Sequence, residues 1–85
     1  MGFISGGRMR DLVEYIVKFL VSNPDKVVAK EVTGLKVTII ELRVAKEDMG
    51  RVIGKEGKTA TALRTILQAS GAKSGRVYNL EIVED

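Results

Sequence analysis

The first half of the chain predicts one amphipathic helix followed by two strands. The helix has an apolar face, with residues spaced by three and four, that consists of Met9, Leu12, Val13, Ile16 and Leu20. Ser22-Asn23-Pro24 ends this helix, because the residue before a proline avoids helical backbone angles. Residues 27–32 and 36–45 are rich in Val, Ile and Thr, and Thr33-Gly34 separates them. We therefore expect a helix and then an antiparallel pair of strands.

The second half predicts two helices and a last strand. Residues 47–53 begin with two acids and space their apolar residues by three and four, as a short helix does. A longer helix follows, and its apolar face consists of Thr59, Ala62, Leu63, Ile66 and Leu67. Gly71 is suited to cap that helix, and Ser74-Gly75 then turns the chain. Residues 76–83 alternate as a strand with one buried face, so the expected order is α-β-β-α-α-β.

Composition indicates one small domain. The chain has 85 residues, of which 45% are hydrophobic, and a chain of this size buries roughly 60 to 70% of its unfolded surface around a single core. We expect the domain to span residues 9–85, with residues 1–8 as a leader or a flexible N-terminus. The apolar stretch YIVKFLV is far shorter than the roughly 20 residues of a membrane span, so no membrane partner is expected.

Two missing residue types narrow the possible functions. The chain has no Cys, so it has no disulfide framework, as is usual in cytosolic proteins. It also has no His, and the two absences together remove the usual zinc ligands and the commonest general base. We therefore expect a cytoplasmic protein that is not an enzyme and needs no cofactor.

Positive charge is concentrated in one part of the chain. The net charge is +3, from 14 Lys and Arg residues against 11 Asp and Glu residues. Residues 43–76 contain eight positive and three negative side chains, whereas residues 77–85 contain three negative ones and no positive one. The basic region therefore favours an anionic partner, and the sequence GKEGKT lies within it.

GKEGKT, which begins at Gly54, is the candidate anion-binding segment. Gly54 and Gly57 bring no side chain and accept positive φ angles, so a sugar-phosphate backbone could approach closely. Lys55, Lys58 and the nearby Arg51 add positive charge, and the amides at the start of the second helix point to the same place. The alternative is a plain turn between two helices with solvated charges, because glycines often cap helices.

A nucleotide-hydrolysing P-loop also ends in Gly-Lys-Thr, but the spacing here excludes one. Gly57-Lys58-Thr59 would need a glycine five residues before Gly57, and that position is Val52. A strand would also have to precede the loop, whereas the pattern predicts a helix there. The anion is therefore expected to be a polynucleotide rather than a nucleoside triphosphate.

The segment RVIGKEGKTATALRTIL, residues 51–67, resembles the helix, Gly-x-x-Gly loop and helix of a KH domain. The order α-β-β-α-α-β resembles the type II, bacterial variant of that domain, and the resemblance extends over residues 9–83. A whole chain made of one such domain is similar to the small stand-alone bacterial KH proteins of the KhpA type, a family of RNA chaperones. The resemblance implies a two-layer α+β fold in which three helices cover one face of a three-stranded sheet.

The resemblance also implies a binding site for short single-stranded RNA, with the loop clamping about four nucleotides of backbone. The clamp would consist of Gly54, Lys55, Glu56 and Gly57. Glu56 departs from a simple phosphate site, because its negative charge opposes phosphate unless the side chain points away.

Residues beside the loop would complete the site. The expected phosphate contacts are Arg51, Lys58 and Arg64. Val52, Ile53 and Leu63 either form apolar groove surface or belong to the core. Residues 43–76 contain no aromatic residue, which argues against RNA-binding modules that depend on aromatic stacking and fits a groove of aliphatic side chains.

A single small site provides few contacts, so we expect pairing to add affinity. The resemblance implies a homodimer, or a heterodimer with a larger KH-containing RNA-binding protein, and a role in the control of cell shape. The alternative is a protein-interaction module in which the glycine loop is only structural.

Overall fold

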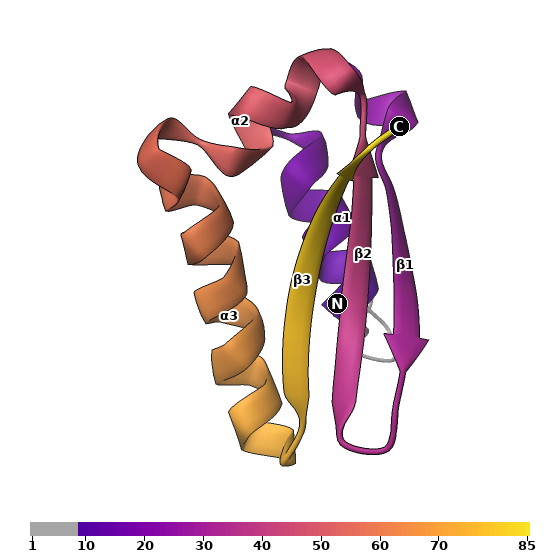
Figure 1. Ribbon diagram of the computed structural model, residues 1–85, viewed down its shortest axis with the longest axis vertical. Helices are drawn as coiled ribbons and strands as arrows, with labels where there is room; N and C mark the ends of the chain where they lie inside the picture. Colours follow the sequence, from indigo (N-terminus) through magenta and orange to yellow (C-terminus); the bar gives the residue numbers. More distant parts are fainter. Residues whose placement is uncertain (1–8) are drawn as a thin grey trace.

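A computed structural model describes residues 9–85, and the leader expected over residues 1–8 lies outside this range. The helices are α1 (Met9–Lys18), α2 (Met49–Ile53) and α3 (Lys58–Ser74), and the strands are β1 (Val28–Thr33), β2 (Val37–Val44) and β3 (Val77–Glu84) (Figure 1). Short 3-10 turns lie between them: η1 (Pro24–Lys26), η2 (Lys46–Asp48) and η3 (Lys55–Gly57). The expected order and the α+β class are confirmed.

The three strands form one mixed sheet in the order β1-β2-β3. β1 and β2 are antiparallel, as expected, with Val28 opposite Arg43. β2 and β3 are parallel, with Ile40 opposite Leu80. Parallel neighbours need a long crossover connection, and the segment containing α2 and α3 supplies it. The Gly-x-x-Gly loop lies within that crossover, away from the strands.

The helices cover one face of the sheet. α1 packs against β1 and β2, and α3 packs against β3 (Figure 1). Alternate residues of β2 are buried beneath them, namely Thr38, Ile40, Leu42 and Val44, while the residues between are more exposed. The buried cluster also takes Val13 and Val17 from α1, Val52 from α2, and Leu63 and Leu67 from α3. One apolar core therefore lies between the two layers.

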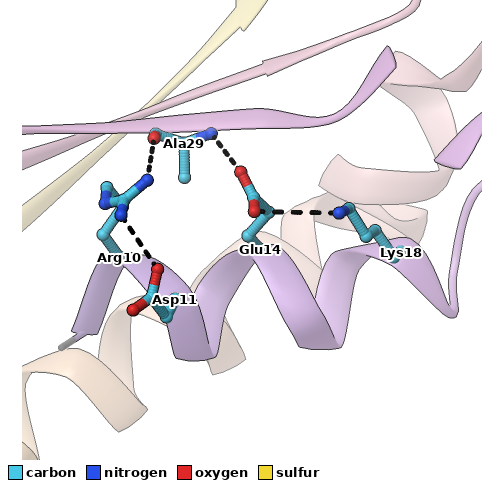
Figure 2. A network of polar contacts seen from close by, with 5 residues as sticks. All are labelled: Arg10, Asp11, Glu14, Lys18 and Ala29. Atoms are coloured by element: carbon cyan, nitrogen blue, oxygen red, sulfur yellow. Dashed lines mark hydrogen bonds and ion pairs between the residues drawn. The ribbon is translucent and has the colours of Figure 1, made fainter. Parts of the chain in front are cut away.

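Side chains of α1 close the edge of β1 at Ala29. Glu14 Oε2 accepts a hydrogen bond from the Ala29 N–H at 2.9 Å, and Arg10 Nη1 donates to the Ala29 carbonyl at 3.3 Å (Figure 2). Lys18 Nζ lies 3.7 Å from Glu14 Oε1, and Asp11 Oδ1 lies 3.0 Å from Arg10 Nη2. Unpaired groups on an edge strand invite another strand, so this network protects the edge while joining α1 to the sheet.

The expected C-terminal cap at Gly71 is wrong. α3 continues to Ser74, and Gly75, with φ of 72°, provides the left-handed cap. Gly71 is buried inside the helix, and a Cβ there would lie 2.4 Å from the Arg76 carbonyl oxygen and 2.8 Å from Tyr78 Cδ2. The glycine therefore allows close packing of α3 against the start of β3.

The apolar face expected for the second helix is correct only in part. α3 buries a stripe that consists of Ala60, Leu63, Leu67 and Gly71. Ala62 is exposed and Ile66 is 42% exposed, so both lie outside the core. Both residues have the spacing from Leu63 that a helical apolar face requires. The stripe of α3 that is buried is nevertheless narrower than the predicted apolar face.

Candidate nucleic-acid interface

The Gly-x-x-Gly loop is a single tight turn between α2 and α3. The Gly54 N–H donates to the Gly50 carbonyl at 2.8 Å, and the Gly57 N–H donates to the Gly54 carbonyl at 3.1 Å. Gly54, Glu56 and Gly57 all have positive φ angles, of 81°, 57° and 73°. Three residues with positive φ among four turn the chain sharply from one helix into the next.

Gly54 is required at its position for two reasons. Its φ of 81° and ψ of 169° belong to a region that is essentially restricted to glycine. A Cβ there would also lie 2.3 Å from Thr59 Oγ1 and 2.8 Å from the Thr59 nitrogen. Gly57 is different, because a Cβ would meet nothing within 4 Å and only its φ of 73° disfavours a side chain. The space in front of Gly57 is therefore open to a ligand backbone.

Glu56 turns its charge toward a neighbouring lysine. Its carboxylate Oε1 lies 3.7 Å from Lys58 Nζ, and both side chains are mostly exposed. An exposed pair of this kind is worth at most about 1 kcal/mol, so an incoming phosphate can compete for Lys58. Lys55 is exposed and forms no ion pair within residues 9–85. The loop therefore offers two cations, one of them partly neutralised.

A buried carboxylate just before α2 supports the loop. Asp48 is 1% exposed and accepts hydrogen bonds from the Ser22 N–H at 2.9 Å, the Asn23 N–H at 3.0 Å and Asn23 Nδ2 at 3.0 Å. The Ser22 amide contributes most to holding the pKa of Asp48 below its ordinary value, the Asn23 donors and the Arg51 charge add to this, and burial opposes it. Sequence reasoning treated this residue only as an acid at a helix start.

Asp48 also touches one of the predicted phosphate contacts. Its Oδ1 lies 3.8 Å from Arg51 Nε, and the Arg51 side chain is 61% exposed. Arg51 is therefore held at one end of its guanidinium while the rest faces solvent. This arrangement places a largely exposed cation on the helix that leads into the loop.

The structure separates the three apolar residues expected beside the loop. Val52 is completely buried and Leu63 is 4% exposed, so both belong to the core and neither offers surface to a base. Ile53 is 39% exposed next to Gly54. The groove expectation is thus corrected for Val52 and Leu63, whose side chains point between the layers, and it remains a prediction for Ile53.

Arg64 lies on α3, two turns beyond the loop, and its side chain reaches β3. Its Nη2 donates to the Leu80 carbonyl at 3.5 Å, a long hydrogen bond to the outer strand of the sheet. Arg51, Lys55 and Lys58 gather around the loop itself, whereas Arg64 extends the positive charge along α3. Backbone glycines, helix-start amides and several cations suit the sugar-phosphate backbone of a nucleic acid.

Within residues 9–85, no cluster of three or more acidic residues is placed to hold a metal ion. In the same part of the chain, no helix combines the length and the hydropathy that crossing a membrane requires.

Comparison with known proteins agrees with this geometry. The family model described as KhpA/KhpB, KH domain, matches residues 10–82. The chain is 51% identical over 76 residues to the RNA-binding protein KhpA of Aquifex aeolicus, which covers 89% of this chain and 96% of that protein. It is 47% identical over 77 residues to the RNA-binding protein KhpA of Chlamydia caviae, which covers 91% and 99%. No solved structure matches the chain.

A third relative, the RNA-binding protein KhpA of Clostridium acetobutylicum, is 48% identical over 75 residues, which covers 88% of this chain and all of that protein. The matched residues include α2, α3, the Gly-x-x-Gly loop and nearly all of α1 and of the sheet. The expected KH resemblance is therefore confirmed, and the chain belongs to the KhpA/KhpB family of KH-domain proteins.

Proposed function

We propose that this protein binds short single-stranded RNA and that the loop of Gly54, Lys55, Glu56 and Gly57 clamps the RNA backbone. One observation carries the proposal: the loop combines two glycines with positive φ, open space at Gly57 and exposed lysines at the start of a 17-residue helix. The relatives named RNA-binding protein KhpA support it. The function is binding rather than catalysis.

Each part of the loop has a separate task. Gly54 makes the turn, and Gly57 lets the sugar-phosphate chain approach the backbone of the protein. Lys55 and Lys58 attract phosphates, and the positive end of the α3 dipole adds to their field. Arg51 and Arg64 extend the phosphate track on either side, and Ile53 supplies exposed aliphatic surface for a base.

We also propose that the protein acts as an RNA chaperone in the cytoplasm, together with a partner. A clamp for about four nucleotides gives modest affinity, and linking two clamps raises it without new contacts. The partner is a second copy or a larger KH-containing RNA-binding protein, and the pair regulates RNA and influences cell shape. The family resemblance supports these roles.

The clamp is tested by replacing Lys55 and Glu56 with Asp and measuring binding to a pool of cellular RNA. Asp accepts the left-handed conformation at position 56, so the turn should survive, and circular dichroism checks it. Lys46 and Glu47 provide a matched control, because the same two substitutions there give the same change in net charge at exposed positions. We expect K55D/E56D to lose RNA binding and K46D/E47D to retain it. Unchanged binding by folded K55D/E56D would overturn the clamp.

One observation favours a second function, that of a protein-interaction module. Apolar side chains are exposed around one end of the uncovered sheet face, with Val32 at 50%, Val77 at 53% and the turn residue Leu35 fully exposed. This function predicts that K55D/E56D leaves the main binding activity intact, whereas Leu35→Ser abolishes it.

A further inference from the structure

Two turns form the end of the molecule that lies opposite the glycine loop. One turn joins β1 to β2, the other joins α3 to β3, and both lie at the lower end of the view in Figure 1. The Val77 N–H donates to the Lys36 carbonyl at 3.3 Å, so the two turns lie side by side. We call the surface made by residues 32–38 and 73–77 the two-turn end.

Four aliphatic side chains are exposed at the two-turn end. Leu35, in the turn of the hairpin, is completely exposed, and Val32, Val37 and Val77 are each between 37% and 53% exposed. Val37 is opposite Val77, and Val32 is opposite Ile39, on the face of the sheet that the helices leave uncovered. A completely exposed leucine contributes no burial to the fold, so its side chain is available to an apolar partner.

Positive charge accompanies these aliphatic side chains. Lys36, Lys73 and Arg76 are all exposed, and residues 32–38 and 73–77 include no acid. None of the three cations forms an ion pair within residues 9–85. The acid nearest to the hairpin turn in sequence, Glu31, alternates with Val32 and therefore lies on the other face of β1. The two-turn end thus combines three unpaired positive charges with exposed aliphatic surface.

We propose that the two-turn end binds the surface of a bilayer containing anionic phospholipids, with Leu35 inserted among the acyl chains and the three cations at the headgroups. Binding of this kind grows with the apolar area buried and with the attraction of basic residues to anionic lipids. The sequence pattern predicted no membrane partner because it lacks a spanning segment. Interfacial binding needs no such segment, and only the fold brings together two turns that are distant in sequence.

The surface suits a lipid better than a nucleic acid or a protein. A nucleic acid offers phosphates to the cations, but no part of it requires a completely exposed leucine. A stable protein interface covers roughly 800 Å² on each partner, and four aliphatic side chains supply only a small part of that area. A bilayer offers anionic headgroups and an apolar interior within a few ångströms of each other, which matches cations placed beside a protruding aliphatic side chain.

Binding at this end leaves the glycine loop accessible. α3 has 17 residues between the loop and the second turn, and at 1.5 Å per residue its length is roughly 25 Å (Figure 1). This distance is about three times the screening length at physiological salt, so the cations of the two ends act separately. The lipid proposal therefore does not depend on the RNA clamp.

The first test measures co-sedimentation of the full chain with vesicles at physiological salt. The vesicles contain phosphatidylcholine and phosphatidylglycerol at about 7:3, or phosphatidylcholine alone, and we expect at least about tenfold tighter binding to the acidic ones. Lys36→Gln should weaken that binding about fivefold, the effect of one cation near an anionic surface. Lys46→Gln removes the same charge from an exposed position beyond the other end of β2 and should change it less than about twofold.

The second test asks whether Leu35 enters the bilayer. The chain contains no Trp, so Leu35→Trp introduces a single indole fluorophore at the hairpin turn. We expect acidic vesicles to shift its emission to the blue and brominated lipids to quench it. Val28→Trp places the indole at an exposed position at the other end of β1, on the same face, and its emission should not change. Leu35→Ser should weaken vesicle binding about tenfold, and circular dichroism checks that this exposed turn tolerates it.

The outcomes separate the two-turn end from the clamp. If acidic vesicles bind no better than neutral ones, or if the emission of bound Leu35→Trp does not shift, the lipid proposal is overturned. If Leu35→Ser loses a protein partner or RNA while no vesicle binds, another macromolecule occupies this end and the proposal is also overturned. K55D/E56D should bind acidic vesicles within about twofold of the unmodified protein, so a failure of the clamp and a failure of the lipid site are distinguishable.

Discussion

The carboxylate of Asp48 accepts a hydrogen bond from the backbone N–H of Ser22 at 2.9 Å, across 26 residues of sequence. This bond ties the chain that leaves α1 to the residue that precedes α2, and so to the helix that enters the glycine loop. The carboxylate is almost completely buried. If it were removed, no water could take its place as the hydrogen-bond acceptor of the surrounding N–H donors. Asp48 therefore joins the end of the first helical segment to the start of α2, the helix that leads into the glycine loop.

The Asp48 contact predicts a pH-dependent stability. Because the Ser22 amide holds the pKa of the folded carboxyl below its ordinary value, this contribution is present above about pH 4, the pKa in the unfolded chain. It is lost as the pH falls through the lower pKa of the folded state. We expect Asp48→Asn to lower the melting temperature at pH 7 and the two proteins to converge in acid.

Thermal unfolding followed by circular dichroism between pH 2 and pH 7 measures this convergence. Glu47→Gln removes a neighbouring exposed acid and is the matched control, which should unfold like the unmodified protein at pH 7. A constant difference between Asp48→Asn and the unmodified protein across this range would show that the charge of Asp48 does not stabilise the fold.

The two loop glycines should tolerate substitution differently. Gly57→Ala should cost roughly 1–2 kcal/mol of unfolding free energy, because the only obstacle is a left-handed backbone. Gly54→Ala should cost clearly more, because its Cβ would also collide with Thr59. Denaturant titration measures both. Gly57→Asn is the control, since Asn accepts this conformation and should recover part of the loss. Equal losses at the two glycines would contradict the described turn.

Substitution of Gly71 should lower the stability of the fold, although the residues next to it on α3 are not buried. Gly71→Ala places a Cβ 2.4 Å from the Arg76 carbonyl, so we expect lower stability despite the better helix propensity of alanine. Gly50→Ala is the matched control, because a Cβ there meets nothing within 4 Å and should stabilise α2 by roughly 0.5–1 kcal/mol. Denaturant titration of both variants checks this. The two substitutions should change the free energy of unfolding in opposite directions. A stabilised Gly71→Ala variant would rule out close packing between α3 and β3 at that residue.

Glu56 should weaken RNA binding in the native protein. Glu56→Gln removes the negative charge from the clamp and frees Lys58 from its 3.7 Å ion pair. We expect RNA affinity to rise by up to about fivefold, which corresponds to the largest value typical of an exposed pair. Fluorescence anisotropy with a short RNA measures it, and Glu47→Gln controls for net charge. Weaker binding by Glu56→Gln would mean that the carboxylate contacts the RNA favourably.

The salt dependence of RNA binding should report how many phosphates the site neutralises. If Arg51, Lys55 and Lys58 each neutralise one phosphate, the logarithm of the binding constant should fall against the logarithm of salt concentration with a slope of about −2. Lys58→Gln should reduce the slope by about 0.7, while Lys73→Gln should leave it unchanged. Binding titrations at four or five salt concentrations give the slope, and a flat response argues against a phosphate clamp.

The sequence by itself determined the elements and their order. Apolar spacing of three or four residues is a local property of a helix, and alternation is a local property of a strand, so α1, β2 and β3 follow from neighbouring residues. The same is true of the glycine loop. Its two glycines, its flanking helices and its lysines are all contained in one short segment that could be interpreted without the rest of the chain.

Only the tertiary structure decided which of these residues face solvent. Val52 and Ile53 are adjacent and equally apolar, yet one is completely buried and the other is 39% exposed, because only one side of α2 faces the core and α3. Gly71 resembled a helix end and is instead a point of close contact with β3. Asp48 became a support for the loop through residues distant in sequence. Periodicity records neighbours along the chain, whereas these roles depend on contacts made across the fold.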